Sequence, residues 1–197
     1  MSDNEIEFAK SEMRAGRHDV ALATWHTILV AEPDNITALI GSGDCLMALK
    51  MHQPAVDAYA RAHQLRPDIM PLVFALGTAE VAAGQVEQAS VHLQQYLAHD
   101  DKNPHAHNNL ALALTKLGDH DKARVHAEQA QTLQQKTSTI SRKVRRQNPN
   151  DWQGLFDAGR GHIRQGEFGQ ARDSFQSYLM AQPNDHRGWE CLGISEL

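Results

Sequence analysis

The sequence predicts an all-α protein of about five stacked helical hairpins, followed by the first helix of a sixth. Three observations support this fold class. Four alanines recur at intervals of 34 residues: Ala21, Ala55, Ala89 and Ala123. Within each interval the apolar residues follow the 3.6-residue period of a helix. Hydrophobic residues make up 41% of the 197 positions and charged residues 22%, a balance that favours folding over disorder.

Each 34-residue unit is predicted to contain two helices separated by a tight turn. In the second unit one apolar stripe covers residues 39–46 and another covers residues 55–65. Pro54 suits the first turn of the second helix, where its missing N–H costs nothing, and Pro67 closes the unit. A single hairpin cannot bury its own apolar face, so the units are expected to stack against one another.

The spacing predicts where each unit begins. The expected first residues of the five complete units are Ser2, Ile36, Met70, Pro104 and Trp152. A partial sixth unit starts at His186 and contains only twelve residues. We therefore expect three segments: four repeats over residues 2–137, an insertion over 138–151, and the fifth and partial sixth repeats over 152–197.

The fourteen inserted residues allow two interpretations. A stripe formed by Leu133, Ile140 and Val144 favours a continuation of the preceding helix to about Arg146, with Pro149 ending it. The polar residues 137–139 favour a flexible linker instead.

The insertion is also where the charge of the chain changes sign. The net charge is −7 over residues 1–135, +5 over 136–150 and −3 over 151–197, which leaves −5 for the whole chain. Nucleic-acid binding by the protein as a whole is therefore not expected. The basic residues are Lys136, Arg142, Lys143, Arg145 and Arg146. They suit a solvated helix C-terminus or pairing with the acidic repeats; the alternative function is binding of RNA or another acidic surface.

These features resemble the tetratricopeptide repeat (TPR) family over nearly the whole chain. The matching features are the 34-residue period, a small residue at unit position 8, alanine at 20, proline at 32 and a bulky residue at 24. The bulky residues are Trp25, Tyr59, Leu93 and Phe175. Ser42, Ala127 and Asp101 depart from the family pattern. The resemblance implies a right-handed α-solenoid that binds peptides or protein surfaces, usually in the concave groove lined by the first helix of each unit.

The expected groove changes from apolar to polar along the chain. Unit positions 5 and 12 of the first three units form an apolar track: Ile6, Met13, Ile40, Met47, Phe74 and Val81. The fourth unit offers Asn108 and Asn109, and the fifth offers Arg160 and Arg164. This face would accept an apolar or amphipathic segment of another protein. The alternative is that the apolar residues only pack against neighbouring helices.

Two specialised ligand sites of the family are not supported. The residues of the chaperone-tail carboxylate clamp are missing, because no unit has lysine at position 5 or asparagine at position 9. The asparagine ladder of O-linked N-acetylglucosamine transferase requires asparagine at position 6, and only Asn109 fits.

Neither catalysis nor a cofactor is expected. No phosphate-binding loop, dinucleotide fingerprint, nucleophile elbow or HExxH motif occurs in the sequence. Three of the twelve histidines, His18, His52 and His120, share unit position 17 and are interpreted as turn-packing residues rather than metal ligands. The two cysteines, Cys45 and Cys191, form no CxxC pair and are expected to be free thiols.

The expected setting is cytoplasmic, because the acidic N-terminus lacks the apolar core of a signal peptide and no stretch is long enough to span a bilayer. The last helix lacks the polar cap with which solenoids normally end. This open end suggests either self-association or a longer protein. In the second case the repeats would recruit substrates or partners for a bacterial transferase, of the glycosyl- or sulfotransferase type. The main expectation is a non-catalytic scaffold that binds another protein or peptide.

Overall fold

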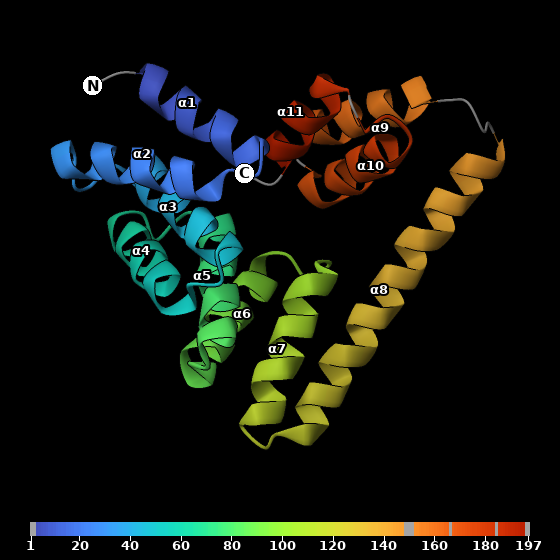
Figure 1. Cartoon of the computed structure of the whole chain (residues 1–197). Coiled ribbons are helices and arrows are strands. Elements are labelled where there is room, and N and C mark those ends of the chain that lie inside the picture. Colours follow the sequence, from blue (N-terminus) through green and yellow to red (C-terminus); the bar gives the residue numbers. More distant parts are fainter. Residues whose placement is uncertain (1–2, 148–151, 166, 184, 196–197) are drawn as a thin grey trace. The chain divides into compact units, whose positions relative to one another are not determined.

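The computed structural model describes residues 3–147, 152–165, 167–183 and 185–195, and every regular element in these residues is an α-helix. Figure 1 shows the helices following one another along the chain, joined by short connections. Their bounds are α1 Asp3–Arg14, α2 His18–Ala31, α3 Ile36–Ala48, α4 His52–Leu65, α5 Met70–Ala83, α6 Val86–His99, α7 Pro104–Lys116, α8 His120–Gln147, α9 Trp152–Gln165, α10 Phe168–Ala181 and α11 His186–Ser195.

The odd-numbered helices are the first helices of the units, here called A helices, and the even-numbered ones are B helices. The A helices α3, α5, α7, α9 and α11 begin at the residues where the 34-residue spacing places the start of a unit. Pro54 lies in the first turn of α4, as predicted. The structure therefore confirms the all-α hairpin repeat.

The helical hairpins are grouped into two compact parts of the chain, called unit 1 and unit 2 from here on; 'unit position' still means a position within one 34-residue repeat. Unit 1 covers residues 1–101 and 105–127, and unit 2 covers residues 102–104 and 128–197. Helix α8 runs without interruption from His120 to Gln147 and passes through the stretch for which both a helix and a linker were considered. Residues 148–151 lie outside the described residues.

Left-handed backbone positions end the A helices of unit 1. Gly16, Gly84 and Gly118 have φ values of 74°, 84° and 84°. Glycine adopts this conformation without steric cost and commonly terminates helices. In the second repeat Lys50 occupies the equivalent position with φ of 60°. The turn geometry is thus the same in all four repeats, although only three of them have glycine there.

Small residues at unit position 8 bring the two helices of a hairpin into close contact. A Cβ atom at Gly43 would lie 2.5 Å from Cε1 of Tyr59 on α4, which is closer than atoms can pack. The same holds for Gly77 against Leu93. These contacts explain why the second and third repeats have glycine at this position.

The core of unit 2 is aromatic. Phe175 on α10 is fully buried and meets the edge of Phe156 on α9, with ring centroids 5.7 Å apart. Tyr178 approaches Phe156 from the same helix, with centroids 5.1 Å apart. Among the described residues no helix combines the length and the apolar character needed to cross a bilayer.

Candidate functional site

The predicted apolar track lies on the A helices of unit 1. Residues at unit positions 5 and 12 are seven apart, or two helical turns, so each pair shares one side of its helix. Five of the six side chains are half-buried: Ile6, Met13, Ile40, Met47 and Phe74. Val81 is 6% exposed and belongs to the core cluster that includes Val86 and Leu114. Val81 therefore offers little surface to a partner.

Contacts with the core hold the half-buried residues in place. The sulfur of Met13 accepts a hydrogen bond from Nε1 of Trp25 at 3.3 Å. Ile40 and Met47 pack against the core cluster formed by α3, α4 and α5. The ring of Phe74 lies 5.0 Å from that of Tyr96 on α6, tilted by 35°. The track thus has a fixed inner side, and its outer side remains partly exposed.

Asparagine and threonine join the A helices α5 and α7. Nδ2 of Asn109 donates a hydrogen bond to Oγ1 of Thr78 at 3.0 Å. The hydroxyl of Thr78 donates in turn to the carbonyl of Phe74 at 2.8 Å. Asn109 is half-buried, whereas its neighbour Asn108 is exposed. Asn108 is therefore the more accessible of the two predicted asparagines.

The structure adds one apolar residue that the track pattern missed. Leu112 on α7 is 47% exposed and lies one helical turn after Asn108. It occupies unit position 9, whereas the pattern was read only at positions 5 and 12. The sequence did contain a signal for Leu112. This position is polar in the first three repeats (Lys10, Asp44 and Thr78), and the fourth repeat has an apolar residue there instead.

The other polar groups of this face are tied to neighbours in unit 1. Lys10 contacts Glu7 at 3.1 Å. The hydroxyl of Tyr59 donates to Oδ1 of Asp44 at 2.5 Å. Burial and the adjacent carboxylate raise the pKa of Tyr59 well above its ordinary value. Tyr59 consequently stays protonated and acts as a hydrogen-bond donor that orients Asp44.

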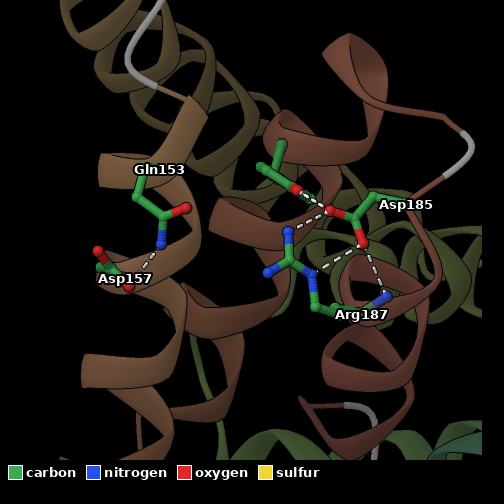
Figure 2. A network of polar contacts seen from close by, with 5 residues as sticks. Gln153, Asp157, Asp185 and Arg187 are labelled. Atoms are coloured by element: carbon green, nitrogen blue, oxygen red, sulfur yellow. Dashed lines mark hydrogen bonds and ion pairs between the residues drawn. The ribbon is translucent and has the colours of Figure 1, made fainter.

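In unit 2 the predicted arginines Arg160 and Arg164 are both exposed on α9, one helical turn apart. A third arginine, Arg187 on α11, lies 5.4 Å above the ring of Phe156. Nη2 of Arg187 contacts Oδ2 of Asp185 at 2.8 Å. Figure 2 shows Arg187 turned toward Asp185. Among the described side chains of unit 2, Arg160, Arg164 and Arg187 are thus exposed, and the guanidinium of Arg187 is held by a carboxylate.

Asp185 is the centre of this polar network. It accepts hydrogen bonds from the hydroxyl of Tyr178 and from the backbone N–H and guanidinium of Arg187. These bonds stabilise the ionised carboxylate and lower the pKa of Asp185 far below its ordinary value. The network fixes the start of α11 against α10. Figure 2 also shows Gln153 donating to Asp157 on α9, at 3.2 Å.

The predicted basic segment is described only in part. Lys136 is exposed on α8. The side chains of Arg142, Lys143, Arg145 and Arg146 lie outside the described residues. Of the turn histidines, His18 and His52 are half-buried at the first residues of α2 and α4, while His120 is exposed at the start of α8. The described residues include no group of three side chains arranged to hold a metal ion.

Comparison with protein families gives a match to the tetratricopeptide repeat over residues 6–68 and 74–136. Comparison with curated proteins gives no match. Among solved structures, a crystal structure of MamA shares 19% identity with a TM-score of 0.59, over 89% of this chain and 94% of that one. A MamA fragment from Desulfovibrio magneticus RS-1 shares 18% identity with a TM-score of 0.63, over 94% and 99%.

A third similar structure is YrrB, titled a TPR protein with an unusual peptide-binding site. It shares 19% identity with a TM-score of 0.60, over 96% of this chain and 91% of that one. At such identities these structures support the fold alone. The family match covers more than half of the residues and agrees with the observed helical hairpins. The chain therefore belongs to the tetratricopeptide repeat family.

Proposed function

We propose that the A-helix face of unit 1 binds a peptide segment of a partner protein through apolar side chains. TPR proteins bind other proteins or peptides, so an interaction scaffold is the general role of this architecture. The proposal adds where the partner binds and through which kind of contact. The partner would make apolar contacts with the half-buried residues Ile6, Met13, Ile40, Met47 and Phe74.

The observation that carries the proposal is the half-burial of these five residues on successive A helices. A side chain that only filled the core would be covered, as Val81 is. Each of the five instead keeps part of its surface on one face while its inner side is held by the core. A preformed apolar surface of this kind lowers the entropic cost of binding a peptide.

Methionine makes the face adaptable. Met13 and Met47 occupy the same unit position in the first two repeats. The unbranched thioether side chain adjusts to partners of different shape. We therefore expect an amphipathic or apolar segment rather than a strictly defined sequence.

Unit 2 by itself offers the exposed pair Arg160 and Arg164, which favours ligands with acidic residues. Guanidinium groups bind carboxylates with two parallel hydrogen bonds. Their role is to select among ligands by charge, since exposed ion pairs contribute little affinity.

The test is selection of peptides from a displayed library on the full chain, followed by fluorescence anisotropy of the enriched peptides. Met47→Glu introduces a charge into the track, and we expect it to weaken binding at least tenfold. The matched control is Val30→Glu on α2, because Val30 is 70% exposed on a B helix. Met47→Glu is preferred to Phe74→Asp because Phe74 also packs against Tyr96.

Equal binding by Met47→Glu and the unaltered chain, with helical circular dichroism retained, would refute the proposed site. Equal losses in Met47→Glu and Val30→Glu would show that the A-helix face has no special role.

A further inference from the structure

A buried carboxylate and two histidines form a row where α4, α5 and α6 pack together, with His92 in contact with both Glu80 and His63. Glu80 on α5 is 3% exposed, and its Oε2 lies 2.8 Å from Nδ1 of His92 on α6. The ring of His92 meets that of His63 on α4 edge to face, with centroids 5.7 Å apart and an interplanar angle of 81°. Nδ1 of His63 is buried and has no hydrogen-bond partner among the described residues. Three helices thus contribute one ionisable group each.

The repeat itself does not require these residues. The position of His63 carries leucine in three other repeats: Leu29, Leu97 and Leu179. The position of Glu80 carries leucine in two, Leu46 and Leu114, and an ionisable residue in two, Glu12 and His162, but neither of these two follows a histidine at the position of His63. An apolar side chain suits the packing at both positions. The ionisable cluster is therefore particular to the junction between the second and third repeats.

The geometry disfavours a proton on His63. Nδ1 of His92 faces the carboxylate of Glu80, which can accept its hydrogen bond. A proton on Nδ1 of His63 would place a buried N–H without an acceptor beside the ring of His92. Burial and His92 accordingly lower the pKa of His63.

The ionisable groups that face one another come from every helix of the junction: His63 from α4, Glu80 from α5 and His92 from α6. The hydrogen bond that joins α7 to α5 is between the neutral residues Asn109 and Thr78.

We propose that this cluster makes the packing of α4 against α5 and α6 sensitive to acid. In the unfolded chain His63 binds its proton near pH 6.5, whereas in the folded chain it does so only at lower pH. The unfolded state therefore binds more protons in this range, and stability is lost as the pH falls through it. Burial raises the pKa of Glu80, which has the opposite effect on stability.

The substitution His63→Leu removes the histidine together with its interaction with His92, while Glu80 and His92 stay in both chains. The full chain, His63→Leu and the control His26→Leu are melted at pH 7.5 and pH 5.5 and followed by circular dichroism. His26 is exposed on α2, so its loss tests the general effect of removing a histidine. We expect the fall in Tm between the two pH values to be about 3 °C smaller in His63→Leu than in the unaltered chain. His26→Leu should behave like the unaltered chain.

The proposal would be overturned if Tm fell equally in His63→Leu and the unaltered chain. It would also be overturned if His26→Leu reduced the fall in Tm as much as His63→Leu does. Should His63→Leu fail to fold, His63→Gln serves the same purpose, since the fourth repeat carries Gln131 at this position. Glutamine is neutral at both pH values, so His63→Gln should also reduce the fall in Tm between pH 7.5 and pH 5.5.

Discussion

Two glycines on one helix separate the effect of close packing from that of helix propensity. Gly159 and Gly161 both lie within α9, two residues apart. A Cβ atom at Gly159 would lie 2.6 Å from Cζ of the fully buried Phe175, with two more ring atoms closer than 3.0 Å. A Cβ atom at Gly161 would meet no atom within 4 Å. Alanine should therefore have opposite consequences at the two positions.

The expected magnitudes follow from these distances. Alanine in place of glycine stabilises a helix by about 0.5–1 kcal/mol, and this should be the whole effect of Gly161→Ala. Gly159→Ala gains the same amount but forces the ring of Phe175 to move, at a cost of about 1–3 kcal/mol. Gly161→Ala should consequently be more stable than Gly159→Ala by about 1–3 kcal/mol.

The assay is thermal unfolding of both variants followed by far-ultraviolet circular dichroism. For a chain of this size 1 kcal/mol corresponds to about 2–4 °C in Tm, so the two variants should differ by about 2–12 °C. A Tm of Gly159→Ala equal to or above that of Gly161→Ala would refute the argument that position 8 is small because α9 and α10 approach closely.

Three further predictions concern single groups. Asn35 caps α3 by accepting a hydrogen bond from the N–H of Ala38 at 3.0 Å, so Asn35→Ala should lose about 1 kcal/mol in urea unfolding; no loss would exclude the cap. Burial raises the pKa of Cys45 to about 11, so in a Cys191→Ser chain this thiol should react with a disulfide reagent at pH 8 only after unfolding; rapid labelling of that folded chain would contradict the burial of Cys45. The Arg66 guanidinium lowers the pKa of Asp68 to about 2, so this exposed ion pair is present at neutral pH, contributes little stability, and is lost as the pH falls through that value. NMR titration of Arg66→Gln should show the pKa of Asp68 rising toward its ordinary value, and an unchanged pKa would rule out this pairing.

The starts of the helices could be predicted because the packing constraint repeats along the chain. Gly43, Gly77 and Gly159 are small for the same reason, the approach of the B helix, and so they recur at one unit position. The left-handed turn at Lys50 could not be predicted from the residue itself, since lysine rarely adopts positive φ.

The exposure of the candidate site could be predicted less well. Helical periodicity places Met47 and Val81 at the same unit position, but it does not say how much of each side chain the neighbours cover. Methionine is long enough to reach the surface of the A helix, whereas the shorter valine is enclosed by the core. Leu112 was missed because the first three repeats have polar residues at its unit position, so no repeated apolar pattern marks it.

The junction of Glu80, His92 and His63 was not predicted either. The three residues come from three helices and from two repeats. Their meeting depends on how successive hairpins pack, and a pattern confined to one unit contains no information on that contact.

The most direct test of the central claim is an NMR titration of the chain labelled at its methionine methyl groups, using a peptide selected by display. Met13 and Met47 lie in the track on the A helices, whereas Met51 lies in the turn after α3 and Met180 on the B helix α10. Binding to the proposed face should shift the signals of Met13 and Met47 and leave those of Met51 and Met180 in place. Unchanged signals of Met13 and Met47 in the presence of a saturating peptide would contradict the account.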